Sequence, residues 1–190
     1  MRKLTKYCLK KLVCGLLSAA LVTVSVPTCF TGLGVNAETA GNYIKNGDFE
    51  SLDNDTSPDY SPNEWEFVSG GWYIEKVGTA VEGNAYLVAT QDSESKQTVS
   101  LPNGSYDFSG WLNPSYNVNE IKITLKSGAN EASVSVKNGE TAAYKTIDRF
   151  EVTTGEITIT LTADVVTNFD AAAILDDLKL VKSSDNFIKN

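Results

Sequence analysis

The sequence predicts an all-β domain in which two antiparallel sheets pack face to face as a sandwich or jelly roll. From Asn42 onward, apolar side chains recur at every second position in one short segment after another, and turn residues separate the segments. The same region shows no stripe with the 3.6-residue period of a helix. About nine or ten short strands without helices between them bury their apolar faces most economically in two packed sheets.

The strands can be placed in order along the chain. EIKITLK and EITITLTA are the clearest, because isoleucine and leucine alternate with lysine and threonine, as in a half-buried strand. These two segments begin at Glu120 and Glu156. Further strands are expected at residues 43–49, 71–77, 85–90, 132–136, 144–152 and 171–181.

The segment SKQTVSLPNGSYDFSGWL predicts a hairpin. One strand would run through Leu101, the residues Pro102-Asn103-Gly104 would form the turn, and a second strand would return from Ser105 to Leu112. The polar, turn-rich residues 51–63 predict a long surface loop after the first strand.

The amino-terminal 37 residues predict a signal peptide and therefore a secreted protein. Five basic residues lead into the apolar run from Leu12 to Val26, and small residues at Val35-Asn36-Ala37 suit a signal peptidase that cleaves after Ala37. A retained membrane anchor is the alternative, but the run is shorter than the roughly 20 residues of a spanning helix. We therefore expect a signal peptide at 1–37, one domain at 38–182, and a tail or truncated linker to a following domain at 183–190.

Charge and composition exclude several functions. The signal peptide would remove five of the 16 basic residues and none of the 24 acidic ones, which leaves 11 basic against 24 acidic residues and a net charge of −13. Such a chain is a poor partner for nucleic acid. All three cysteines lie within residues 1–37, and there is no histidine. Disulfides, histidine-dependent catalytic triads and histidine-ligated metal sites are therefore not expected in the secreted domain.

Two adjacent carboxylates, Asp176 and Asp177, interrupt the apolar segment ILDDLKL. On a regular strand their side chains point to opposite faces, so they cannot both flank one glycosidic bond. One of them would point inward and need a partner. If the first and last strands are neighbours, Asp48 and Glu50 lie near Asp177, and oxygen ligands of this kind suit Ca²⁺. The alternative is that these acids cap turns and face water.

Four segments together carry a resemblance. NYIKNGDFES, EWEF, SKQTVSLPNGSYDFSGWL and AAILDDLKL, in this order from Asn42 to Val181, resemble the secreted jelly-roll carbohydrate-binding modules of the galactose-binding-like superfamily. In such modules the acid of the NGxFE segment and the second acid of the DD pair commonly hold a structural calcium ion. The resemblance therefore implies Ca²⁺ bound by Glu50 and Asp177, with a role in stability. Asp177 is then expected to point inward, and Asp176 to be its neighbour on the solvent side.

The tail DNFIKN resembles the opening of the catalytic domain of bacterial arabinogalactan endo-β-1,4-galactanases, which can follow a module of this type. The resemblance implies that the chain is the sugar-binding part of such a protein and that a catalytic domain is its partner in a longer chain. The 190 residues leave no room for the catalytic barrel, which takes roughly 250 residues. We expect no hydrolysis by this chain.

Sugars stack their C–H faces on exposed aromatic rings while polar groups bind their hydroxyls. In the strand from Ser105 to Leu112, Tyr106 and Phe108 are the better core candidates, so Trp111 should emerge on the other face. The expected sugar-binding residues are Trp111, Asn113, Tyr116 and Asn117, with Trp72 as a further candidate. Packing of Trp111 under a loop is the alternative. Trp65 is expected in the core.

The predicted function is that of a secreted, non-catalytic module that binds a plant cell-wall polysaccharide, with β-1,4-galactan as the expected ligand. Two alternatives remain open. The chain could be a fragment of a glycoside hydrolase that acts through acids such as Glu75, Glu82 or Asp92, or a cell-surface adhesion domain without a sugar ligand.

Overall fold

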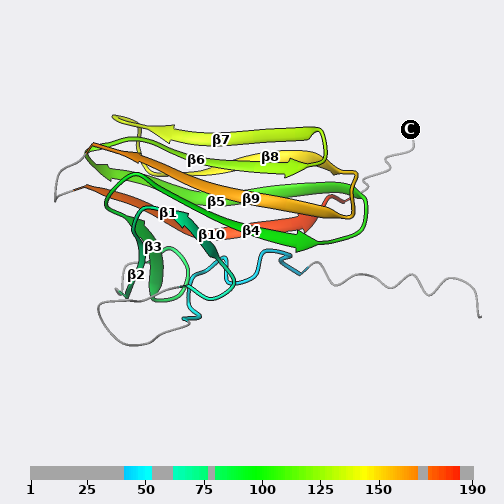
Figure 1. Ribbon diagram of the computed structural model, residues 1–190, viewed down its shortest axis with the longest axis horizontal. Coiled ribbons are helices and arrows are strands. Elements are labelled where there is room, and N and C mark those ends of the chain that lie inside the picture. The colour runs from blue at the N-terminus through cyan, green and yellow to red at the C-terminus, as the bar shows by residue number, and fades with distance from the viewer. Residues whose placement is uncertain (1–40, 53–61, 77–79, 167–170, 185–190) are drawn as a thin grey trace, which may run out of the picture. The chain divides into compact units, whose positions relative to one another are not determined.

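The computed structural model describes residues 41–52, 62–76, 80–166 and 171–184 (Figure 1). The predicted signal peptide, most of the predicted surface loop and the DNFIKN tail lie outside these residues. The described part of the chain contains strands and turns, and no helix long and apolar enough to cross a membrane occurs in it.

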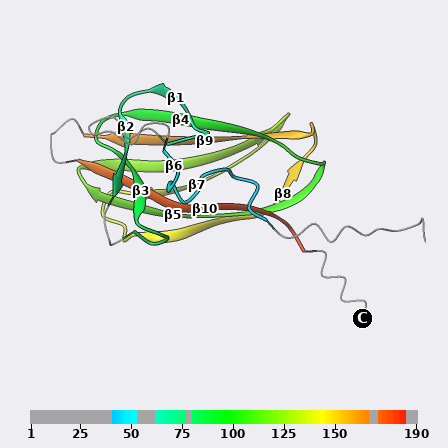
Figure 2. The same cartoon turned by 90° about the horizontal axis from the view of Figure 1, so that it is seen from below.

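The described strands form two five-stranded antiparallel sheets. Their bounds are β1 Glu66–Ser69, β2 Trp72–Lys76, β3 Ala85–Ala89, β4 Ser93–Ser100, β5 Gly104–Tyr116, β6 Val118–Ser127, β7 Asn130–Lys137, β8 Ala143–Val152, β9 Glu156–Val165 and β10 Ala172–Lys182. The first sheet has the order β1-β4-β9-β6-β7, and the second has the order β2-β3-β10-β5-β8. Figure 2 shows β4 and β9 in one layer and β5 and β10 in the other. The predicted all-β jelly-roll sandwich is confirmed.

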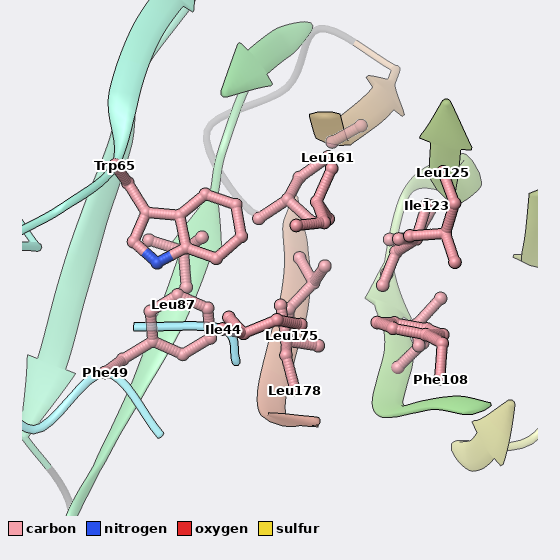
Figure 3. Close-up of a cluster of buried hydrophobic side chains, with 14 of the residues drawn as sticks. Ile44, Phe49, Trp65, Leu87, Phe108, Ile123, Leu125, Leu161, Leu175 and Leu178 are labelled. Atoms are coloured by element: carbon pink, nitrogen blue, oxygen red, sulfur yellow. The ribbon is translucent and has the colours of Figure 1, made fainter. Parts of the chain in front are cut away.

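The core lies between the two sheets. Alternate residues of the strands supply it, for example Ile123 on β6, Leu161 on β9 and Leu175 on β10, all fully buried. Figure 3 shows Phe49 and Trp65 within the same cluster of side chains. Their ring centroids are 5.9 Å apart, and Trp65 is 7% exposed, as expected for a core tryptophan.

The predicted hairpin at residues 95–112 is wrong in its pairing. β4 pairs with β1 and β9 in the first sheet, whereas β5 pairs with β10 and β8 in the second sheet. The turn at Pro102 is therefore an arch between the sheets. The hydroxyl of Tyr106 donates to the carbonyl oxygen of Pro102 at 2.7 Å and ties this arch to the core. A hairpin and an arch use the same turn residues, so composition alone did not distinguish them.

The predicted strand at 43–49 is also wrong, although this segment does lie beside β10. Asn46 and Phe49 have φ angles of 49° and 55°, which interrupt extended backbone. The amide of Tyr43 donates to Leu180 O at 2.8 Å, and the amide of Leu178 donates to Gly47 O at 2.9 Å. The first segment of the domain therefore does lie beside the last strand, as expected, but it is a turn-rich segment and not a strand.

Candidate functional site

The outer face of the second sheet carries the candidate site. On β5, Tyr106, Phe108 and Leu112 are buried toward the core, so the alternating side chains of Trp111 and Asn113 point outward. Trp111 is only partly buried. The structure thus agrees with the expected outward direction of Trp111.

Trp111 lies within a row of aromatic side chains that crosses the sheet. It pairs with Tyr144 on β8 and with Asp176 on β10. On its other side, β10 is antiparallel to β3, and Leu175 pairs with Leu87. Continuing this register places Tyr86 of β3 opposite Asp176. We call Tyr86, Trp111 and Tyr144 the aromatic row. Strands lie about 4.8 Å apart, so the three strand intervals of this row span about 14 Å.

Carboxylates bind the hydroxyl groups at both ends of the aromatic row. The hydroxyl of Tyr144 donates to Asp177 Oδ2 at 2.8 Å. Burial and this hydrogen bond raise the pKa of Tyr144 to about 12. Burial, followed by the charge of Glu75 and a hydrogen bond to it, likewise raises the pKa of Tyr86 to about 12. Both phenols therefore stay neutral at physiological pH. The hydroxyl of Tyr86 is bound to the neighbouring strand β2, and that of Tyr144 is bound across β5 to β10.

The two aspartates of ILDDLKL occupy a bulge in β10. The pairing with β5 shifts register between Asp176 and Lys179, and Asp177 has a φ of 50°. By alternation from Ile174, Asp176 points to the outer face, yet it is completely buried. Its carboxylate accepts hydrogen bonds from the amides of Val81, Glu82 and Asp177 at 2.7, 3.1 and 2.7 Å. Asp176 therefore holds the segment before β3 onto the outer face.

The charge on Asp176 is costly despite these donors. Desolvation raises the pKa of its carboxyl above the usual value, the three backbone donors lower it, and the charge of Asp177 raises it again. Asp177 is 6% exposed and forms an ion pair with Lys179, with Oδ1 and Nζ 2.7 Å apart. This ion pair raises the pKa of Lys179.

The predicted directions of the two aspartates are corrected by this geometry. Asp176 is not the solvent-exposed neighbour, and the carboxylate of Asp177 does not point into the core, because it reaches Tyr144 and Lys179. The bulge interrupts the regular strand, so the rule that neighbouring side chains face opposite sides does not hold at these two residues. Both carboxylates are nevertheless bound to donors of the protein itself. They are therefore poorly suited to exchange protons with a substrate as an acid/base pair.

Two of the other expected sugar-binding residues, Asn113 and Tyr116, lie on β5, and Asn117 lies at the turn that follows. Asn113 faces outward opposite Ile174, and Tyr116 pairs with Ala172 beyond a register shift and is 69% exposed. Tyr116 lies five positions after Trp111, a distance of about 16 Å along the strand. Asn117 is exposed with a φ of 50°, and its carbonyl oxygen accepts the amide of Val166 at 2.8 Å. It stands at the turn after β5.

The expectation that Trp72 faces outward is wrong. Trp72 pairs with Ala89, and both are buried in the core, with Trp72 only 6% exposed. Its indole N–H has no hydrogen-bond partner among the described residues. The neighbouring Tyr73 takes the outward position, where burial and the charge of Glu75 raise its pKa. Two adjacent aromatic residues leave the phase of the alternation open, so the sequence did not decide which one is buried.

Tyr86 and Tyr144 were not expected at the site, although each carried a signal. In AYLVA, Tyr86 stands between Ala85 and Leu87, which are buried. In AYKTIDRF, Tyr144 is the first of a series of exposed residues at every second position, continued by Thr146 and Asp148 before the buried Phe150. Alternation alone could have placed both tyrosines on the outer face. Their closeness to Trp111 depended on strand order, which the sequence did not reveal.

The residues expected to bind calcium lie in one region but are not gathered around one point. Asp48 and Asp177, together with Glu82, line a cavity of about 330 Å³ beside β10. Glu50 Oε1 instead accepts the amides of Asn84 and Ala85 at 2.5 and 2.7 Å. No three acidic side chains within the described ranges are close enough to share a metal ion. The oxygen donors suit Ca²⁺ in kind, but their present spacing does not fit it.

The fold is that of a class that includes carbohydrate-binding modules. Solved structures with this jelly-roll sandwich include the module TmCBM61 in complex with β-1,4-galactotriose, with a TM-score of 0.59 and 25% sequence identity. The match covers 75% of this chain and 99% of the module.

Two further structures share the fold at lower identity. A xylan-binding domain of the CBM22 class matches with a TM-score of 0.50 and 10% identity, over 75% of this chain and 96% of that domain. The enzymatically active domain of the tailspike protein 4 of bacteriophage CBA120 matches with a TM-score of 0.55 and 12% identity, over 75% of this chain and 21% of that one. No protein-family model and no curated protein sequence matches the chain.

Proposed function

We propose that this chain is a secreted, non-catalytic carbohydrate-binding module that binds a plant cell-wall polysaccharide, with β-1,4-galactan as its ligand. The observation that carries the proposal is the aromatic row on the outer face of the second sheet, in a fold shared with a module that binds β-1,4-galactotriose. The predicted signal peptide supports secretion.

The outer face offers the two kinds of contact that sugars need. Trp111 provides an aromatic surface for the C–H face of a sugar ring, and Asn113 next to it on the same face provides an amide for hydroxyl groups. Tyr116, which is 69% exposed, adds a second ring about 16 Å along the strand. A polysaccharide could contact Trp111 and Tyr116 together, whereas a single sugar could contact only one of them.

Three of the acids weighed for catalysis, Glu75, Asp92 and Asp176, have other partners. Glu75 accepts a hydrogen bond from Tyr86, and Asp92 Oδ1 accepts the amide of Val165 at 2.8 Å. Asp176 accepts three amides. These contacts favour structural roles and support the proposal that the chain does not itself hydrolyse glycans. Any hydrolysis would belong to a catalytic domain that follows the module in a longer chain, as the DNFIKN segment suggests.

We also propose a structural Ca²⁺ beside β10, held by Asp48 and Asp177, which line the cavity there, and by Glu50, which lies outside its lining. The charge balance supports this ion, because Asp48, Glu82 and Asp177 line the cavity, whereas Lys179 is the only basic residue of the described ranges that does. A divalent cation would offset the remaining negative charge. Binding would require Glu50 to turn from the amides that it now accepts, and Asp177 Oδ1 to exchange its contact with Lys179 for the ion. The role of the ion would be stability.

Affinity electrophoresis tests the proposed function. The chain should migrate more slowly in gels that contain galactan than in gels without polysaccharide, and xylan and β-glucan gels report its specificity. A Trp111→Ala variant should lose this retardation. Phe67→Ala is its matched control, because Phe67 is an exposed aromatic residue on β1 of the other sheet. It should be retarded like the wild type. If no polysaccharide retards the wild-type chain, the sugar-binding proposal is wrong and the adhesion alternative gains support.

A further inference from the structure

Tyr144 has an unusual combination of exposure and restraint. It lies on β8, at the edge of the second sheet, and it is 50% exposed. Its hydroxyl nevertheless binds Asp177 on β10, at 2.8 Å, so the side chain reaches across the intervening strand β5. The residue of β5 that pairs with Tyr144 is Trp111. The tyrosine ring therefore extends across the sheet from the position beside Trp111.

Asp177 is itself firmly held. Its side chain is 8% exposed, and its other oxygen lies 2.7 Å from the ammonium group of Lys179. Its backbone amide donates to Asp176 Oδ1, and Asp176 in turn accepts the amides of Val81 and Glu82. A buried carboxylate that is fixed by an ion pair is a strong and well-oriented hydrogen-bond acceptor. The carboxylate can therefore fix the position of a side chain that is otherwise free to rotate.

We propose that Asp177 is a positioning residue of the sugar-binding face, which orders the Tyr144 ring beside Trp111 before the ligand binds. This inference rests on the proposed function. A ring that is already ordered does not lose its rotational freedom on binding, so more of the stacking energy contributes to affinity. The aspartate acts through Tyr144 and does not itself touch the sugar.

The backbone of Asp177 allows a clean test. Its φ of 50° is a conformation that glycine adopts without strain, so Asp177→Gly removes the carboxylate and preserves the bulge. Tyr144→Phe keeps the ring and removes only the hydroxyl. Asp177→Asn keeps an oxygen that can accept the Tyr144 hydroxyl, and asparagine also tolerates this backbone conformation. Arg149→Gly is the matched control, because Arg149 is exposed on β8 and has a φ of 54°.

The affinity of each variant for a β-1,4-galactan oligosaccharide is measured by titration calorimetry. Asp177→Gly and Tyr144→Phe should each bind about fivefold more weakly, the change expected when one hydrogen bond of about 1 kcal/mol is lost. The double variant should bind no more weakly than either single variant, because both changes remove the same contact. Asp177→Asn, which keeps an acceptor for the Tyr144 hydroxyl, should bind more tightly than Asp177→Gly, and Arg149→Gly should bind like the wild type.

A second measurement does not depend on the ligand. Nuclear Overhauser contacts between the rings of Tyr144 and Trp111 should be present in the wild type and in Asp177→Asn, and lost in Asp177→Gly. The inference is overturned if Asp177→Gly keeps both these contacts and the wild-type affinity, or if the two single changes multiply in the double variant. Either result leaves the proposed function standing as long as the wild type binds. If the wild type binds no glycan, the proposed function itself fails.

Discussion

Replacing Gly47 by alanine would break the contact between the amino-terminal segment of the domain and β10. A Cβ atom at this position would overlap the carbonyl oxygen of Leu178, and it would lie only 3.1 Å from the carbonyl carbon of Leu178 and 3.2 Å from Ile44 Cγ2. The overlapping atom belongs to the backbone, so a side-chain rotation cannot relieve the clash. The segment must move away from β10.

The cost follows from the contacts that this movement would break. The amide of Leu178 donates to Gly47 O at 2.9 Å, and Asn42 Nδ2 donates to Leu178 O at 2.8 Å. Two lost hydrogen bonds at about 1 kcal/mol each and an overpacking cost of about 1–3 kcal/mol give about 3–5 kcal/mol. For a domain of about 150 residues, this loss lowers the Tm by between about 6 and 20 °C.

Thermal unfolding followed by circular dichroism measures this shift. Ser133→Ala is the control, because Ser133 is exposed on β7 and already carries a Cβ atom, so the change introduces no new contact. Its Tm should match that of the wild type. A Gly47→Ala variant that melts within about 2 °C of the wild type, less than 1 kcal/mol, would refute the close approach of this segment to β10.

Three further predictions concern the metal, the tyrosines and catalysis. Addition of a calcium chelator should lower the Tm by several degrees, as expected when a ligand of the folded state is removed, and superimposable melting curves would exclude the ion. Because the pKa of Tyr86 is raised from 10.0 to about 12, its contribution to stability is complete below pH 10 and is lost as the pH rises through 12. Tyr86→Phe should therefore lose less stability than the wild type between pH 10 and 12 in urea titrations, and equal losses would contradict the assigned cause. Incubation of the chain with galactan should release no reducing sugar, and measurable release would favour the glycoside hydrolase alternative.

Much of the fold could be predicted because hydrophobic alternation reports directly on strands with one buried face. The segments that begin at Glu120 and Glu156 became β6 and β9 with the expected faces. Alternation does not report which strands pair. The sequence therefore predicts a hairpin at Pro102, whereas in the structure this turn connects a strand of one sheet to a strand of the other.

The site was predictable only where one strand decided the direction of a side chain. Trp111 follows Tyr106 and Phe108 in a clear alternation, so its outward direction could be inferred. Trp72 and Tyr73 are adjacent, and only the packing of β2 against β3 decides which of them is buried. The bulge at Asp177 depends on a local backbone conformation that no sequence period reveals.

The most direct test of the proposed sugar-binding face is a map of the residues that the sugar contacts. A titration of the isotopically labelled chain with a β-1,4-galactan oligosaccharide, followed by two-dimensional NMR, reports every residue that the ligand perturbs. If the outer face of the second sheet binds the sugar, the shifts are concentrated at Trp111, Asn113 and Tyr144. Shifts confined to the first sheet, for example at Thr124 and Thr160, would contradict it, and an unperturbed spectrum would contradict sugar binding itself.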